Sequence, residues 1–283
     1  MGVLTAVRPG GALAGLLRDY STEVTPRDLR SIEAAADLLP TGAEVFIAAV
    51  PGETPDRMVQ AAVRLRRSGL TPVPHITARS LASLDAADRL IGRLRDEAGV
   101  DRALALGGDR DTPAGALHSS QQLIESGVFH RRGFSRLFIA CYPEGHPSIA
   151  GEVLEQARSA KLRIAAEQGL AVTLVSQFCF EAAPIVALAR RLRAPYRVGV
   201  AGPADRATLI RYGLMCGIGP SLKALRRRQG LSRSLIGRET PEALLAEVAM
   251  ARQANPALGA CGVHIFSFGG LGKSVAWAES LRR

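Results

Sequence analysis

The chain has 283 residues, 47% of them hydrophobic and 22% charged, which is the balance of a globular protein with a substantial core. No run of about 18 apolar residues occurs, and Arg8, Pro9 and two glycines interrupt the first 17 residues, so the sequence predicts neither a membrane span nor a signal peptide. We therefore expect a cytoplasmic protein. The four cysteines include no Cys-x-x-Cys pair, which argues against a disulfide framework or a structural zinc site.

The formal net charge is +10 at neutral pH. Its densest basic cluster runs from Lys223 to Arg233, and no aromatic residues interleave it as stacking platforms for bases would. We interpret the cluster as a solvated helix face, with a rim for phosphate or carboxylate groups as the second interpretation. Nucleic acid is not an expected partner.

Short strand-like runs alternate with helical patterns along the chain. The predicted strands are 20–25, 44–50, 72–77, 102–106, 136–141, 171–176, 196–201 and 262–266. The predicted helices include 26–39, 55–68, one ending near 97, 115–126 and one ending near 216. Eight such units favour an α/β chain that forms a single (β/α)8 TIM barrel, one domain over 1–283, in preference to an open sheet. Segment 220–255 is longer than one crossover needs, which predicts an extra helix between the seventh and eighth units.

In a barrel of this kind the functional site lies where the carboxyl ends of the strands meet. In the stretch Leu104–Pro113 a short apolar run ends in two glycines and Asp109, although Gly-Gly-Asp alone also describes a plain turn. The residues at the predicted strand ends are Glu23, Ala48, Ala49, His75, Thr77, Asp109, Tyr142, Glu144, His146, Gln177, Gly202, Ser267, Gly269 and Gly270. So many polar groups at one mouth exceed what a core tolerates, and they predict a polar pocket.

Several kinds of chemistry lack their usual sequence pattern. No His-x-x-x-His pair supports a metal site, and we expect no metal. No Gly-x-Ser-x-Gly elbow supports a nucleophilic triad. No Gly-x-Gly-x-x-Gly follows a strand, so a nicotinamide would not be bound in the Rossmann manner.

Five motifs at strand ends carry a family resemblance. Ser21–Pro26 resembles Ser-Phe-Glu-Phe-Phe-Pro, Pro74–Thr77 resembles Pro-His-Leu-Thr, and Leu106–Asp109 resembles Leu-Arg-Gly-Asp. Tyr142–Pro147 matches Tyr-Pro-Glu-Gly-His-Pro closely, and Ser176–Glu181 is similar to Thr-Gln-Phe-Phe-Phe-Asp. Each motif alone is unspecific. Together, in this order, they resemble the methylenetetrahydrofolate reductases.

The resemblance implies a (β/α)8 oxidoreductase that interconverts 5,10-methylenetetrahydrofolate and 5-methyltetrahydrofolate, with hydride passing from NAD(P)H through bound FAD. It implies that Glu23 is the general acid that protonates folate N10. It also implies that Asp109 binds the pterin ring, that Gln177 orients this ring, and that Tyr212 stacks on the aminobenzoate ring. The tetrahydrofolate substrate and the nicotinamide are the expected partners. The physiological direction and a homo-oligomeric state stay open.

The same resemblance implies a set of cofactor contacts. They are His75, Thr77, Gly108, Asp109, Ser120, Tyr142, His146 and Lys161. Two positions depart from the family pattern: Gly107 stands where an arginine usually faces the flavin, and Ser119–Leu123 lacks the usual aromatic and acidic residues. Two alternatives therefore stay open, a flavin-independent reductase with direct hydride transfer from NAD(P)H, and a folate-binding barrel without catalysis.

Overall fold

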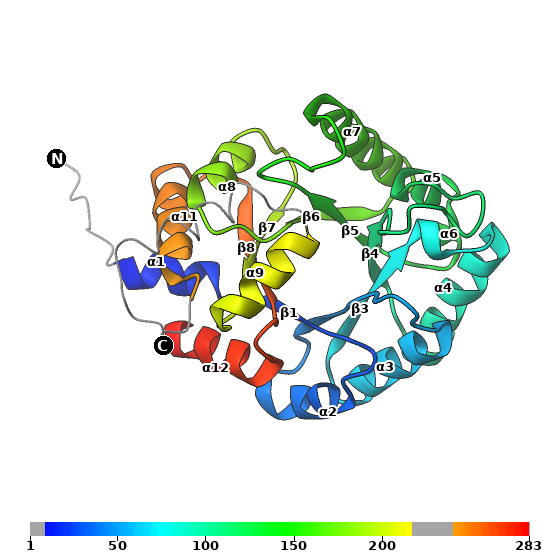
Figure 1. The fold of residues 1–283 in the computed structure, drawn as a ribbon, viewed down its shortest axis with the longest axis horizontal. Helices are drawn as coiled ribbons and strands as arrows, with labels where there is room; N and C mark the ends of the chain where they lie inside the picture. The colour runs from blue at the N-terminus through cyan, green and yellow to red at the C-terminus, as the bar shows by residue number, and fades with distance from the viewer. Residues whose placement is uncertain (1–8, 217–239, 283) are drawn as a thin grey trace.

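Eight parallel strands close into a barrel in chain order, with β8 paired to β1 (Figure 1). This computed structural model describes residues 9–216 and 240–282. The strands are β1 (Ser21–Val24), β2 (Glu44–Ile47), β3 (Thr71–Thr77), β4 (Arg102–Leu106), β5 (Arg136–Cys141), β6 (Ala171–Ser176), β7 (Tyr196–Ala201) and β8 (Ala260–Phe266). The predicted (β/α)8 barrel is confirmed.

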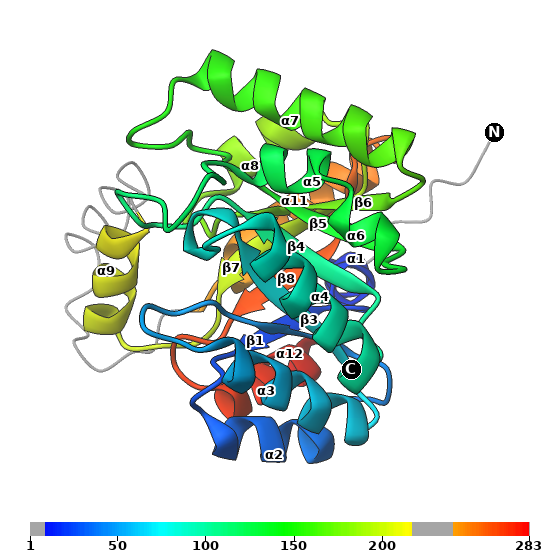
Figure 2. The same cartoon turned by 90° about the vertical axis from the view of Figure 1, so that its right-hand side faces the viewer.

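Helices surround the barrel (Figure 1). They are α1 (Pro9–Leu16), α2 (Leu29–Leu38), α3 (Pro55–Arg67), α4 (Leu84–Ala98), α5 (Ser120–Glu125), α6 (Val128–Arg131), α7 (Gly151–Glu167), α8 (Ala182–Ala189), α9 (Arg206–Met215), α11 (Glu242–Ala254) and α12 (Leu271–Arg282), with a 3-10 turn η1 (Ala78–Ser80) after β3. Helix α9 lies in front of the barrel end in Figure 1 and stands clear of the strands in Figure 2, so it flanks the mouth. None of the described helices is long and apolar enough to cross a membrane.

Two described helices, α9 and α11, lie between β7 and β8, which confirms the predicted extra helix. The rest of that segment, including the basic cluster from Lys223 to Arg233, lies outside the described residues. The predicted helix over 115–126 is wrong at its start, because Ser119 caps α5: its hydroxyl accepts a hydrogen bond from the Gln122 N–H at 3.3 Å. The sequence analysis also missed α1, whose glycine-rich composition hides the helical pattern.

The first two strands end earlier than predicted, at Val24 and Ile47. After β1, helix α2 starts only at Leu29, because Asp28 is its N-cap and accepts a hydrogen bond from the backbone N–H of Ser31 at 3.0 Å. Thr25 and Ala48 to Val50, predicted as strand, lie in loops at the carboxyl end of the barrel that continue to Asp28 and Thr54. These shorter strands leave Glu23 one residue from the end of β1.

The barrel interior is filled by an apolar layer. It consists of Phe46, Val73, Leu104, Phe138 and Val175, each from a different strand and none more than 6% exposed. Phe46 and Phe138 pack edge to face with ring centroids 4.9 Å apart. Such a layer separates the polar groups at the two ends of the barrel.

Below this layer, at the amino ends of the strands, lies an ionic floor made of Glu44, Arg102 and Arg197. Arg102 Nη1 is 2.6 Å from Glu44 Oε1, and Arg197 Nη2 is 2.7 Å from Glu44 Oε2. The second contact is a close ion pair without an aligned hydrogen bond, because Glu44 Oε2 accepts none. Arg197 also lies over the Phe138 ring, 5.5 Å from its centroid. Glu44 therefore bridges two guanidinium groups beneath the apolar layer, one of which, Arg102, also pairs with Asp101 at 2.8 Å.

Replacing Gly199 by alanine is expected to destabilise the barrel by about 1 to 3 kcal/mol, because the new Cβ would lie 2.1 Å from the backbone oxygen of Ser176. Urea unfolding measures this change. Gly15→Ala in α1 is the matched control, because nothing lies within 4 Å of its Cβ position and alanine is the better helix former. Equal stability of Gly199→Ala and the unmodified protein would contradict the packing of β6 against β7.

Candidate functional site

The carboxylate of Glu23 and the ring of His264 face each other inside the barrel, above the apolar layer. His264 is 1% exposed, and its Nε2 lies 3.7 Å from Glu23 Oε2. On the other side of the ring, Nδ1 is 2.9 Å from the hydroxyl of Ser21. The paired register of β1 and β8, with Ser21 opposite His264, brings these groups together. Phe46 packs beneath, 4.4 Å from the imidazole centroid.

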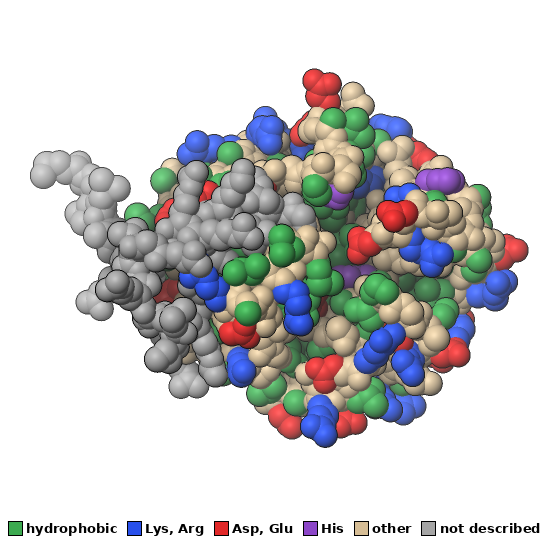
Figure 3. Space-filling view, viewed as in Figure 1, with side chains coloured by type: hydrophobic (Ala, Val, Ile, Leu, Met, Phe, Trp, Pro, Cys, Tyr) green, Lys and Arg blue, Asp and Glu red, His purple; other side chains and the backbone are tan. Residues whose placement is uncertain are grey.

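A second histidine, His75 on β3, completes this group. Its Nε2 is buried and has no hydrogen-bond partner. Burial lowers the pKa of His75 to about 4, with the negative charge of Glu23 opposing this effect and His264 adding to it. His75 is therefore neutral at pH 7 and can exchange hydrogen bonds without adding charge. Figure 3 shows a histidine side chain (purple) inside the hollow at the centre of this face.

Gln177 and the two predicted carboxylates act on Cys216, which follows α9. Gln177 Nε2 donates a hydrogen bond to the backbone oxygen of Cys216 at 3.2 Å. Burial, followed by the charges of Glu23 and Asp109, raises the pKa of the Cys216 thiol to about 11. The charges of both carboxylates thus act on one thiol. Glu23 lies on β1, Asp109 follows β4 and Gln177 follows β6, so all three lie at the carboxyl end of the barrel.

The glycines that precede Asp109 leave room at the end of β4. Nothing lies within 4 Å of a Cβ built on Gly107. Gly108 has a φ of +96°, and a Cβ there would lie 3.2 Å from that of Thr77. Arg79 holds this loop, because its backbone N–H donates to the oxygen of Gly107 at 2.9 Å. Asp109 is exposed at the end of the strand and is therefore free to meet a ligand.

Tyr142 and His146 form an aromatic pair after β5. Their rings meet edge to face with centroids 5.2 Å apart. Burial raises the pKa of Tyr142, and the charges of Cys141 and Asp109 add to the effect. His146 Nδ1 accepts a hydrogen bond from the Ser148 N–H at 3.1 Å. The Tyr142 hydroxyl is therefore protonated at pH 7.

Tyr212 on α9 stacks on the ring of Phe268, so its own ring is not open to a ligand on both faces. Its ring lies 4.0 Å from that of Phe268, with an angle of 11° between the planes. The guanidinium of Arg211 lies 5.1 Å from the same ring. A ligand ring can therefore stack on Tyr212 only after Phe268 moves or from the other face.

Two predicted cofactor residues are less accessible than the others. Ser120 begins α5 and is 7% exposed. Lys161 on α7 lies close to Cys141 and Arg158, and burial lowers the pKa of its ammonium group. Its position against β5 keeps it largely out of solvent. Neither side chain is presented openly to a ligand.

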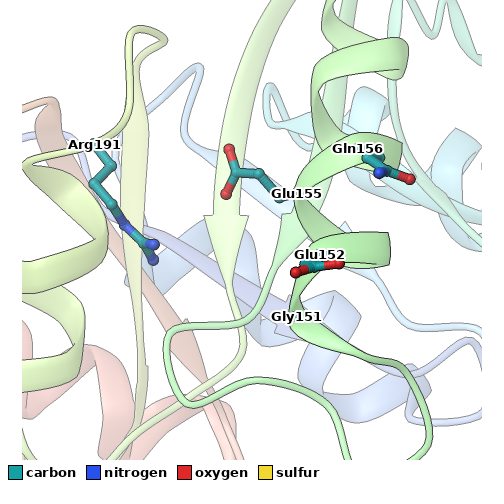
Figure 4. Close-up of a pocket in the computed structure, with 5 residues that line it drawn as sticks. All are labelled: Gly151, Glu152, Glu155, Gln156 and Arg191. Carbon is teal, nitrogen blue, oxygen red and sulfur yellow. The ribbon is translucent and has the colours of Figure 1, made fainter.

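A hollow of about 420 Å³ on the rim of the molecule includes none of the predicted site residues (Figure 4). It is lined by Gly151, Glu152, Glu155, Gln156 and Arg191. In Figure 4 the side chain of Arg191 faces that of Glu155 across the opening. These residues are exposed, and their polar groups can be solvated without a ligand. We therefore assign the candidate site to the barrel mouth.

The sequence analysis missed Ser21, His264 and Cys216 as members of the site. His264 stands inside an apolar run, where it is indistinguishable from a structural strand residue, although its spacing of two from Phe266 points it to the same side of the sheet. Cys216 ends a helix and carries no motif. Within the described residues, no group of three histidine, cysteine or acidic side chains is arranged to bind a metal ion.

No protein-family model matches this chain. Solved structures similar to it include the 3-dehydroquinate dehydratase from Aquifex aeolicus VF5, with a TM-score of 0.49 and 9% identity over 93% of this chain and 96% of that one. Another is a putative lyase/mutase from Burkholderia cenocepacia J2315, with a TM-score of 0.48 and 16% identity over 96% of this chain and 86% of that one. Both names are those of enzymes. Similarity at this level does not assign chemistry, which has to be argued from the mouth itself.

Proposed function

We propose that this protein interconverts 5,10-methylenetetrahydrofolate and 5-methyltetrahydrofolate with a nicotinamide as the hydride donor. The observation that carries the proposal is that Glu23, Asp109 and Gln177 lie at the carboxyl ends of β1, β4 and β6, with Gln177 bonded to the Cys216 backbone and Glu23 beside His264. One acid, one exposed carboxylate and one amide match the needs of a reduced pterin, which offers hydrogen-bond donors and acceptors on one edge and a basic nitrogen farther along.

Each of the three residues has a role that follows from its surroundings. Glu23, with a side chain 14% exposed, is the general acid that gives a proton to N10 and so opens the five-membered ring. Asp109 accepts hydrogen bonds from the amino group and ring nitrogens of the pterin. Gln177, already fixed through its amide nitrogen, orients the same ring with its amide oxygen. Neutral His75 adds a partner for a ligand at its unpaired Nε2.

FAD is the proposed carrier of hydride from NAD(P)H, and when bound it supplies a two-electron step between the two substrates. His75, Thr77, Gly108, Tyr142 and His146 would hold such a group, because they lie on or directly after β3, β4 and β5 and a Cβ at Gly107 would meet nothing within 4 Å. The buried side chain of Ser120 and the partly buried side chain of Lys161 do not fit it without a rearrangement. Direct transfer from the nicotinamide to the folate is the second candidate, favoured by this weaker set of anchors.

The proposal is tested by measuring methylenetetrahydrofolate-dependent oxidation of NADH and NADPH by the purified protein, with and without added FAD. We expect turnover with at least one nicotinamide. A visible flavin band in the purified protein, and activity that falls when the flavin is removed, would support the carrier mechanism. Full activity of a colourless protein would support direct transfer. Absence of turnover under all these conditions, in either direction, would contradict the proposed function.

A further inference from the structure

His264 is a buried histidine whose two ring nitrogens each face one group on β1. Nδ1 lies 2.9 Å from the Ser21 hydroxyl, within hydrogen-bond distance, and Nε2 lies 3.7 Å from the Glu23 carboxylate. The apolar ring of Phe46 packs against the imidazole. A ring held in this way cannot rotate to other partners, so its role is defined by these two contacts.

The direction of the hydrogen bond between the Ser21 hydroxyl and Nδ1 is linked to which nitrogen of His264 carries the hydrogen, because a hydroxyl can donate or accept. When the hydroxyl donates to Nδ1, the neutral ring must carry its hydrogen on Nε2, and that N–H points to Glu23. The opposite tautomer would aim a lone pair at an ionised carboxylate, which is repulsive. The tautomer with Nε2–H therefore fits an ionised Glu23.

We propose that His264 is a positioning residue for Glu23, held by Ser21 so that its Nε2–H stabilises the carboxylate formed when Glu23 gives up its proton. The inference rests on the proposed function and extends it to a residue outside the resembling motifs. In this step the O–H bond of Glu23 breaks and an N–H bond forms on folate N10, whose bond to the methylene carbon then opens. The Nε2–H of His264 then stabilises the negative charge left on the Glu23 carboxylate.

The other titratable groups in the described mouth are Asp109 after β4, a carboxylate that supplies no positive charge, together with His75 from β3 and Cys216 after α9. His75 is neutral at pH 7, because burial lowers its pKa to about 4. Cys216 is a protonated thiol at pH 7, because burial raises its pKa to about 11. Neither supplies positive charge to the carboxylate. Stabilisation of ionised Glu23 therefore falls to His264, whose ring nitrogen is within 4 Å of it.

The test is the pH dependence of kcat for methylenetetrahydrofolate reduction by the full chain and by His264→Phe. Loss of the N–H donor should lower the maximal kcat by about 10- to 100-fold with little change in KM. A donor to the ionised form lowers the pKa of an acid, so its removal raises that pKa. The protonated acid then persists to higher pH, and the alkaline limb of the profile should move up by about one unit.

Ser21→Ala is the second variant, because it keeps the imidazole and removes only the group that fixes its tautomer. It should shift the alkaline limb in the same direction by a smaller amount. Ser274→Ala is the matched control. Ser274 lies in the first turns of α12, and its buried hydroxyl donates to the backbone oxygen of Gly270 at 3.1 Å. The pH profile of kcat should not move in this variant. A lower kcat with an unmoved limb in both His264→Phe and Ser21→Ala would overturn the proposal.

A readout without turnover separates this inference from the proposed function. The ¹⁵N chemical shifts of the His264 ring report its tautomer in the resting protein. We expect hydrogen on Nε2 in the unmodified protein and a mixture of tautomers in Ser21→Ala. Hydrogen on Nδ1 in the unmodified protein would overturn the role of His264 even if turnover is observed. Absence of turnover combined with hydrogen on Nε2 would overturn the proposed function and, with it, the catalytic role of the pair.

Discussion

Glu23→Gln is expected to lower the rate of methylenetetrahydrofolate reduction by a factor of about 10² to 10⁴, because glutamine has the shape of the acid without its transferable proton. The side chain is 14% exposed and lies beside His264, so few solvent molecules can reach the same position. KM should change little, since the amide keeps the contacts of an uncharged acid. Steady-state kinetics at the pH optimum measures both quantities.

The matched control for this variant is Glu33→Gln on α2. Its side chain is 69% exposed and pairs only with Arg64 on α3, at 3.5 Å. The same chemical change there should leave kcat within experimental error. Turnover of Glu23→Gln at the unmodified rate would show that another group protonates the substrate. The simplest alternative proton donor would then be a bound water molecule.

Glu44→Gln is expected to lower the free energy of unfolding by about 2 to 4 kcal/mol. Its carboxylate is 10% exposed and lies between Arg102 and Arg197, whose side chains are 23% and 13% exposed. Without its charge, two guanidinium groups remain close together in a poorly solvated place. Arg102 keeps a second partner in Asp101, at 2.8 Å, which limits the loss. Urea denaturation followed by circular dichroism measures the change.

The control is Glu167→Gln on the outer surface of α7. Glu167 pairs with Arg163 four residues earlier, and both side chains are more than half exposed, at 59% and 64%. Such a pair contributes about 0 to 1 kcal/mol, because solvent screens it. The contrast between the two glutamate variants thus isolates burial. Equal midpoints for both would mean that the floor is solvated in solution.

Much of the fold could be predicted from the sequence because most of its strands correspond to short apolar runs. Runs such as Leu104–Leu106 belong to strands buried on both faces, and eight of them between amphipathic helices have few ways to pack. The boundaries were harder. Whether a helix begins at Pro26 or Leu29 depends on the Asp28 cap, and one hydrogen bond decides it.

Part of the candidate site could likewise be predicted from the local sequence, and part could not. Glu23 lies near the end of β1, Asp109 comes three residues after β4 and Gln177 directly follows β6, so the rule that strand ends meet at one mouth was sufficient to predict them as a group. His264 was missed because its importance comes from the register of β8 against β1, two elements far apart in the chain. Nothing in either local sequence carries that register.

The ionic floor and the aromatic layer above it also constrain the order of events at the mouth. Phe46 and Phe138 are fully buried, and Glu44 ties two strands to β2 beneath them, so in the described part of the chain the amino end of the barrel is sealed. Any molecule that reaches Glu23 must enter and leave through the mouth at the carboxyl end of the barrel. Under the proposed function, the hydride donor and the acceptor either bind in the mouth at the same time or bind there one after the other. Product-inhibition patterns distinguish a ternary-complex mechanism from a ping-pong mechanism.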